Sequence, residues 1–282
     1  MDAIEIKGLC KSYGDYRLDN FSLSLPKGSI LGLAGENGAG KSTVIKLIMN
    51  AERRDAGSVR VLGTEGTAPE FSDLKNDIGI VLDEADFPAV LTPKMLCRVM
   101  ASTYKNWNSA QYFDYVRRFG LPENKKFKDF SRGMKMKLAI AAALSHDAKL
   151  LILDEATGGL DPLVRDEILD ILNDFTRDEE HSILMSSHIV SDIEKICDYF
   201  AFIHKGKLLL CDEKDKILSE YAVAKMSAAE LYDIAPEALH GVKRTPYGVE
   251  ALVEKRLAPE SLRYEHTSLE DIIIFLARED EQ

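Results

Sequence analysis

The 282-residue sequence predicts an α/β protein whose central sheet is mostly parallel. Short apolar runs with the length of buried strands occupy residues 78–82, 149–153 and 182–186, and a helical pattern fills residues 162–177. Strands that alternate with helices favour a parallel sheet covered on both faces. The first thirty residues instead alternate apolar and polar side chains, which predicts half-exposed antiparallel strands in a side sheet.

Two further regions complete the predicted organisation. Residues 85–145 carry apolar side chains at helical spacing, including Trp107 and Tyr112, and predict a helical insertion with an aromatic core. Beyond residue 210 the elements shorten: residues 245–248 indicate a hairpin turn and residues 269–276 a closing helix. We therefore expect one large domain over residues 1–210 and a small α+β appendage over residues 211–282.

Composition narrows the class of protein. A hydrophobic content of 45% suits a globular core, and a formal net charge of −11 opposes non-specific binding to nucleic acid or an anionic bilayer, without excluding a local basic patch. Four scattered cysteines without a Cys-x-x-Cys pair favour neither a zinc site nor a disulfide framework, and they suit a reducing cytosol. The sequence has no signal-peptide pattern and no apolar run near the roughly 18 residues of a membrane span, so we expect a chain that is neither secreted nor membrane-spanning.

A phosphate-binding loop is predicted at residues 35–43, Gly-Glu-Asn-Gly-Ala-Gly-Lys-Ser-Thr, between an apolar strand and a helix. Its glycines allow backbone N–H groups to point at phosphate beside the positive N-terminus of the helix. Lys41 is expected to contact the β and γ phosphates, and the Ser42 hydroxyl to bind Mg²⁺. The pattern indicates a P-loop NTPase whose nucleotide-binding residues are Gly35, Asn37, Gly38, Ala39, Gly40, Lys41, Ser42 and Thr43.

Polar residues also follow two later strands. Asp154 and Glu155 end the strand at 149–153, and we expect this strand to lie next to the one that carries the phosphate loop. Asp154 is then the predicted Mg²⁺ ligand and Glu155 the base that polarises the attacking water. His188 follows the strand at 182–186 and is predicted to contact a γ-phosphate. Each residue type alone also occurs as a plain cap or turn residue; the combination with the phosphate loop indicates nucleotide hydrolysis.

In type and order, the motifs resemble those of the ATP-binding cassette (ABC) ATPases. Residues 35–43 resemble Walker A, residues 150–155 Walker B, residues 159–161 the D-loop and residues 187–188 the H-loop. Phe130-Ser131-Arg132-Gly133-Met134 resembles the Leu-Ser-Gly-Gly-Gln signature that separates this family from other P-loop proteins. The resemblance covers about residues 2–210. It implies adenine stacking on Tyr13 and, across a head-to-tail dimer, nucleotide contacts from Ser131, Arg132, Gly133 and Asp161.

Two positions depart from the family pattern. Arg132 and Met134 replace a glycine and the glutamine of the signature, and the Arg132 guanidinium either adds charge to the anion site or points away toward the partner subunit. Asp83 stands where the Q-loop glutamine is expected. Either Asp83 joins Ser42 and Asp154 as a metal ligand, which is the role we predict, or it is a turn residue.

The resemblance implies the ATP-hydrolysing subunit of a transporter, which uses ATP and Mg²⁺, dimerises on ATP binding and drives a separate permease. The partners would be that permease and a second copy of the chain or a related cassette, at the cytoplasmic face of the cell membrane, with no nucleic acid. The signature variant, Asp83 and the short acidic tail are similar to a bacterial subgroup that pairs with small export permeases.

Two other functions fit the sequence less well. A soluble ABC-type ATPase that acts on the ribosome or DNA resembles fused cassettes or carries long coiled-coil insertions, which this sequence lacks, and the acidic charge opposes it. A P-loop kinase or GTPase would need a different second half, and the sequence has no guanine-reading Asn-Lys-x-Asp.

The expected permease-docking segment runs from residue 84 to 91. Phe87 and Pro88 either form an exposed apolar contact for the permease or plug the insertion against the core.

Overall fold

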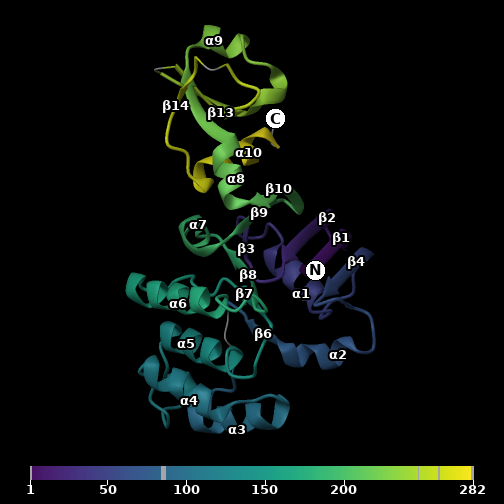
Figure 1. The fold of residues 1–282 in the computed structure, drawn as a ribbon, viewed down its shortest axis with the longest axis vertical. Helices are drawn as coiled ribbons and strands as arrows, with labels where there is room; N and C mark the ends of the chain where they lie inside the picture. The colour runs from purple at the N-terminus through teal and green to yellow at the C-terminus, as the bar shows by residue number, and fades with distance from the viewer. Residues whose placement is uncertain (1, 84–86, 247, 260, 281–282) are drawn as a thin grey trace.

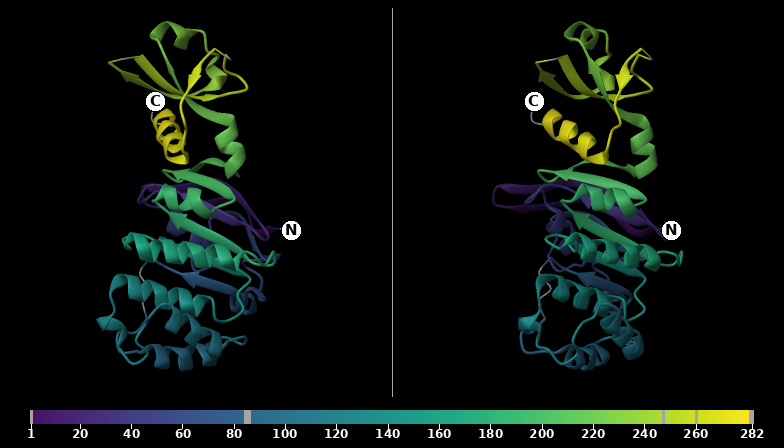
Figure 2. Two further views of the ribbon diagram at one scale, coloured as in Figure 1. Left: turned by 60° about the vertical axis from the view of Figure 1, so that its left-hand side comes forward. Right: turned by 90° about the vertical axis from the view of Figure 1, so that its left-hand side faces the viewer.

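The computed structural model describes residues 2–83, 87–246, 248–259 and 261–280. Figure 1 shows an elongated molecule with the helical insertion at one end, the central and side sheets in the middle and the C-terminal elements at the other end, and the two turned views in Figure 2 agree. The Glu84–Asp86 part of the expected docking segment lies outside the described residues.

The central sheet has the strand order β10-β9-β3-β8-β7-β6. All neighbouring pairs from β9 to β6 are parallel and only β10 pairs antiparallel, so the predicted mostly parallel sheet is confirmed. One expectation was wrong: the strand that ends in Asp154 is not the neighbour of the strand that precedes the phosphate loop, because β8 lies between them. The strands are β3 (Ile30–Ala34), β6 (Ile78–Val81), β7 (Leu150–Asp154), β8 (Ser182–Ser187), β9 (Tyr199–His204) and β10 (Lys207–Glu213).

The side sheet pairs antiparallel throughout, in the order β2-β1-β4-β5, as the alternating pattern of the first thirty residues predicted. Its strands are β1 (Asp2–Tyr13), β2 (Tyr16–Pro26), β4 (Ala56–Val61) and β5 (Thr64–Glu65). Because side chains alternate across a strand, the central strands supply two separate cores. Leu31 and Leu33 belong to the core shared with the side sheet and α1, whereas Ile30 and Ala34 of the same strand belong to the core on the other face, where α7 covers β3.

The helical insertion is confirmed. Tyr112 is fully buried in it, with the Trp107 ring 5.2 Å away, so the predicted aromatic core is present. The helices of the insertion and of the central domain are α1 (Lys41–Ile48), α2 (Phe71–Leu74), α3 (Pro93–Thr103), α4 (Ser109–Arg118), α5 (Arg132–Ala143), α6 (Pro162–Phe175) and α7 (Val190–Ile196), with short 3-10 turns at Lys75–Asp77 and Phe127–Asp129.

The C-terminal elements form an antiparallel sheet, β12-β13-β11-β14, with α10 packed between it and the central domain. The expected hairpin joins β12 to β13, and the expected closing helix is α10. The predicted boundary at residue 210 falls inside β10, and the division into two domains stays a prediction. The elements are α8 (Lys214–Glu220), β11 (Tyr221–Met226), α9 (Ala228–Tyr232), a 3-10 turn at Pro236–Ala238, β12 (Leu239–Thr245), β13 (Gly248–Glu254), β14 (Arg263–Tyr264) and α10 (Leu269–Glu279).

Candidate functional site

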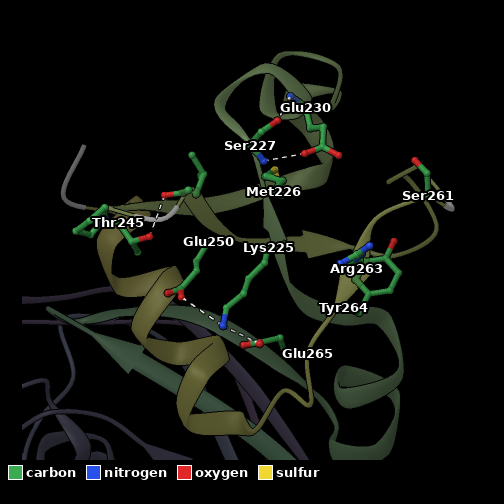
Figure 3. Close-up of a pocket in the computed structure, with 13 residues that line it drawn as sticks. Lys225, Met226, Ser227, Glu230, Thr245, Glu250, Ser261, Arg263, Tyr264 and Glu265 are labelled. Atoms are coloured by element: carbon green, nitrogen blue, oxygen red, sulfur yellow. Dashed lines mark hydrogen bonds and ion pairs between the residues drawn. The ribbon is translucent and has the colours of Figure 1, made fainter.

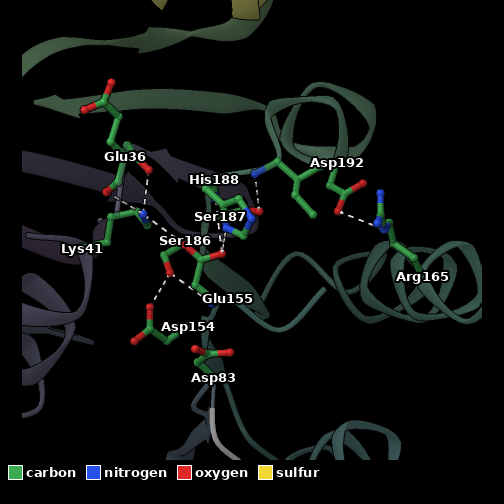
Figure 4. A network of polar contacts seen from close by, with 12 residues as sticks. Glu36, Lys41, Asp83, Asp154, Glu155, Arg165, Ser186, Ser187, His188 and Asp192 are labelled. Atoms are coloured by element: carbon green, nitrogen blue, oxygen red, sulfur yellow. Dashed lines mark hydrogen bonds and ion pairs between the residues drawn. The ribbon is translucent and has the colours of Figure 1, made fainter. Parts of the chain in front are cut away.

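The predicted phosphate-loop residues, the two carboxylates Asp154 and Glu155, and His188 lie where β3, β7 and β8 end, around the N-terminus of α1 (Figure 4). The N-cap of α1 is Gly40, at φ 116°, without a side-chain cap, so the N–H groups of the first turn are left for an anion. A pocket of about 230 Å³ opens there. The loop contributes Glu36, Asn37, Gly38, Gly40, Lys41, Ser42 and Thr43 to its wall, and Tyr16, Asp83 and Glu155 complete it.

Glycine is required by close approach at two positions of the loop. A Cβ atom on Gly40 would lie 1.8 Å from the Tyr16 hydroxyl, and one on Gly35 would lie 2.6 Å from the carbonyl oxygen of Ile203. Gly40 also has a φ angle that other residues rarely adopt. The folded loop therefore requires glycine at these two positions, because a side chain would collide with neighbouring strands.

Lys41 is buried beneath the loop, at 5% exposure. Its Nζ donates hydrogen bonds to the carbonyl oxygens of Gly35 (2.6 Å) and Glu36 (3.1 Å), and it lies 3.0 Å from Glu155 Oε1. A buried ammonium group is tolerated only when such acceptors surround it. The charge of Lys41 is thus held at the floor of the pocket, where the sequence motif places a phosphate.

Glu155 connects Lys41 to His188. The Glu155 carboxylate lies 2.6 Å from His188 Nδ1 through Oε2. Burial would raise the pKa of Glu155, but its contacts with Lys41 and then His188 outweigh burial and hold the pKa below its ordinary value of 4.5. Glu155 also has a positive φ of 52°, which is uncommon for a residue with a side chain and is found where surrounding structure imposes it. A charged carboxylate is therefore fixed at this strand end.

Asp154 is held by a residue that the sequence motifs did not identify. The Ser186 hydroxyl donates a 2.5 Å hydrogen bond to Asp154 Oδ1 and accepts one from the Glu155 backbone N–H (3.2 Å). Ser186 lies on β8, the strand between β3 and β7, which explains the contact. The only sequence signal for it is a polar residue two positions before His188 in an apolar strand.

Two tyrosines lie near the pocket. Tyr13, the predicted adenine platform, is 39% exposed and carries Lys11 Nζ 5.0 Å above its ring. Tyr16, whose ring centroid is 6.4 Å from that of Tyr13, lines the pocket and donates a 3.2 Å hydrogen bond to the Ala39 carbonyl. No sequence motif pointed to Tyr16, and the adenine contact of Tyr13 stays a prediction.

Asp83 and Arg132, the two departures from the family pattern, contact each other. Arg132 Nη2 lies 2.7 Å from Asp83 Oδ1, and about half of each side chain stays exposed, so in this chain the guanidinium has a carboxylate partner of its own. The sequence predictions for Arg132 and Asp83 did not include an ion pair between them. The metal role of Asp83 and the contact of Arg132 with a partner's nucleotide remain predictions.

The remaining signature and D-loop residues occupy helix starts. The Ser131 hydroxyl caps α5 by accepting from the Met134 N–H (3.3 Å), and Asp161 caps α6 by accepting from the Val164 N–H (3.1 Å). Gly133 lies in the first turn of α5. The roles of Ser131, Gly133 and Asp161 across a dimer stay predictions.

In the expected docking segment, Phe87 packs against the insertion, whereas Pro88 is exposed. The Phe87 ring is half-buried and meets the Phe127 ring edge-on at 5.5 Å. Pro88 is exposed, and Val90 is 60% exposed nearby.

A larger hollow of about 890 Å³ lies in the C-terminal sheet and is lined by none of these motif residues (Figure 3). Lys225 there lies 2.7 Å from Glu265 and 3.9 Å from Glu250, and Glu230 is engaged in its own capping box. Its size alone does not make it the functional site, because these charged side chains are matched within the protein.

Comparison with known proteins identifies the family. Residues 18–158 match the family model described as ABC transporter. The chain is 35% identical over 209 residues to the bacitracin transport ATP-binding protein BcrA of Enterococcus faecalis, which covers 73% of this chain and 68% of that protein. It is 35% identical over 215 residues to the lantibiotic transport ATP-binding protein SrtF of Streptococcus pyogenes, covering 75% of this chain and 91% of that one. The chain belongs to the ABC transporter family.

A solved structure agrees with this ABC assignment. An ATP-binding subunit of an ABC transporter superposes with a TM-score of 0.69 at 28% identity, over 77% of this chain and 92% of that one. The ABC chain is accordingly an ATP-hydrolysing transporter subunit with the P-loop NTPase fold, and the soluble alternative is not favoured. Within the described residues, none of the helices has the length and apolar character needed to cross a membrane.

Proposed function

We propose that this ABC cassette hydrolyses ATP with Mg²⁺ as a dimer and thereby drives a separate permease that exports a peptide antibiotic or a similar amphiphilic compound. The contact chain Lys41–Glu155–His188 at the phosphate loop carries the proposal, because it joins a phosphate ligand to a base and its partner. The names of the bacitracin and lantibiotic transport relatives support the substrate class.

In this proposal the incoming triphosphate replaces Glu155 as the partner of Lys41. The backbone N–H groups of the loop and the first turn of α1 bind the phosphates, and Lys41 neutralises the β and γ groups. Glu155, released from Lys41, keeps His188 as its partner and orients the attacking water as a general base. The nucleotide-free pair thus keeps the base charged and in place until substrate arrives.

The oxygen atoms of Ser42 and Asp154 suit a Mg²⁺ ion. Both are hard ligands at the same strand edge, and the hydrogen bond from Ser186 orients the Asp154 carboxylate. The ion would offset phosphate charge in the transition state. Asp83 would be a third ligand only if the ion competed successfully with Arg132 for the Asp83 carboxylate.

The proposed partners are a permease and a second cassette, either a copy of this chain or a related one. In the dimer, Ser131, Gly133 and Asp161 of one chain would face the nucleotide that the other chain holds. The proposed location is the cytoplasmic face of the membrane, where the cassette is held through the permease.

The decisive variant is Glu155→Gln. The amide keeps the shape of the side chain but loses the basic oxygen, so we expect ATP to bind and turnover to fall by on the order of 10² to 10⁴. ATP should then hold a dimer, which light scattering after gel filtration measures, with Lys41→Ala as the variant that stays monomeric. In cells that carry the proposed permease, Glu155→Gln should abolish survival in bacitracin or a lantibiotic. A monomer in ATP or wild-type turnover would contradict the proposal.

A further inference from the structure

Arg132 bridges three segments of its own chain. It is the first residue of α5, its Nη2 is 2.7 Å from Asp83 Oδ1 just beyond β6, and its guanidinium lies against the D-loop. A Cβ atom on Gly159 would lie 3.3 Å from Arg132 Cζ, and one on Gly158 would lie 3.8 Å from Nη2. The side chain therefore runs along the D-loop toward the end of β6.

Asp83 in turn belongs to the nucleotide pocket. It lines the same cavity as Lys41, Ser42 and Glu155. A lone carboxylate at that wall would repel the phosphates of an entering nucleotide, and an opposite charge 2.7 Å away cancels most of that repulsion. A glycine at position 132, as in the family signature, has no side chain that could do this.

We propose that Arg132 is a positioning residue of its own chain's nucleotide pocket, where it neutralises and holds Asp83. Arg132 and Asp83, which both depart from the family pattern, then form a pair in which the positive charge of one residue compensates the negative charge of the other. Both side chains are about half exposed, at 55% and 50%, and exposed ion pairs add little to global stability. The pair should therefore act on nucleotide affinity and leave the unfolding temperature nearly unchanged.

The test is a charge cycle measured as ATP affinity of the single chain, with EDTA present and the monomer verified by light scattering. Arg132→Ala leaves the Asp83 charge uncompensated and should weaken ATP binding by on the order of threefold to tenfold. Asp83→Asn leaves the Arg132 charge uncompensated and should tighten binding by a similar factor. The double variant should return close to wild type, and Arg132→Lys, which keeps the charge, should restore most of the affinity.

A matched control exists in the same molecule. Lys105 and Asp73 form a 2.8 Å ion pair that is also exposed and also joins the insertion to the central domain, but it does not line the pocket. Lys105→Ala and Asp73→Asn should leave ATP affinity unchanged. High salt should shrink the Arg132 and Asp83 effects toward wild type, because screening acts on exposed charges.

The outcomes separate this inference from the proposed function on which it rests. If the wild-type chain binds no ATP, the proposed function fails first. If wild type binds ATP, Lys41→Ala does not, and Arg132→Ala equals wild type, only the role of Arg132 is refuted. If Asp83→Asn weakens binding, and only with Mg²⁺ present, Asp83 is a metal ligand and the inference is wrong.

Discussion

In the nucleotide-free chain, the groups that surround Lys41 compete with ATP for its ammonium group, and this competition determines how much affinity is lost when Lys41 is removed. In the nucleotide-free chain it contacts two backbone carbonyls and Glu155, all of which a triphosphate must replace or share. Lys41→Ala should therefore weaken ATP binding by about 10-fold to 100-fold, the value of one or two charge-assisted hydrogen bonds. Isothermal calorimetry measures the affinity, and an unchanged value would remove Lys41 from the site.

The same variant changes Glu155. Without Lys41, the largest influence that lowers the Glu155 pKa is lost, and burial then raises it. In the intact chain the folded-state pKa is depressed, so the stability that these contacts contribute is present above the ordinary carboxyl pKa and is lost as pH falls through the folded value. Lys41→Ala should reduce this acid-side loss, which denaturation at pH 7 and pH 4 compares.

Tyr13 and Tyr16 offer two aromatic rings for one adenine. If Tyr13 is the platform, Tyr13→Ala should weaken ATP binding by about fivefold, or about 1 kcal/mol, and Tyr13→Phe should not, because stacking needs the ring alone. Tyr16→Phe removes only the hydroxyl that donates to Ala39 and should disturb the loop slightly. A larger loss in Tyr16→Ala than in Tyr13→Ala would move the adenine contact to Tyr16.

The segment between β6 and α3 combines an anchored ring with exposed apolar side chains. Phe87 packs on Phe127, so Phe87→Ala should destabilise the insertion by about 1–2 kcal/mol. Val90 is 60% exposed, so Val90→Ser should leave stability within about 0.5 kcal/mol. If this segment meets the permease, Val90→Ser should still lower the permease-stimulated rate of hydrolysis.

The control for the docking prediction is Ile274→Ser, an exposed apolar residue on α10 at the other end of the molecule. It should leave the stimulated rate unchanged. Crosslinks that place the permease away from residues 87–91 would contradict the assignment.

One of the buried hydrophobic clusters crosses the predicted domain boundary. Ile272 and Phe275 of α10 belong to the same buried cluster as Ile193 and Phe200 of the central domain. Ile272→Ala should therefore destabilise the entire chain by about 2–4 kcal/mol. Ile274→Ala, on the same helix but 43% exposed, should change stability little.

The fluorescence of Trp107 can measure whether the Ile272 variant destabilises the whole chain, because Trp107 is the one tryptophan of the sequence and lies in the distant insertion. A lower denaturant midpoint in its fluorescence would mean that the C-terminal elements unfold together with the rest. An unmoved midpoint would instead support an independent unit over residues 211–282.

Local patterns were sufficient for the elements and for the phosphate loop. Strand and helix periods are properties of consecutive residues, and the phosphate-loop motif lies within nine consecutive residues, although the contacts of Gly35 and Gly40 with Ile203 and Tyr16 come from distant strands. For the same reason the carboxylates at the end of β7 and His188 at the end of β8 were recognisable from their place after apolar runs.

What the linear pattern left open depends on which distant segments meet. Strand order places Ser186 beside Asp154, the β1–β2 hairpin brings Tyr16 to the pocket, and Arg132 reaches Asp83 across 49 positions. Such contacts have no period and no fixed spacing, because chain folding and not chain order sets the distance between them. The sequence therefore determined which reactive side chains stand at the strand ends, and the tertiary structure determined which other side chains contact them.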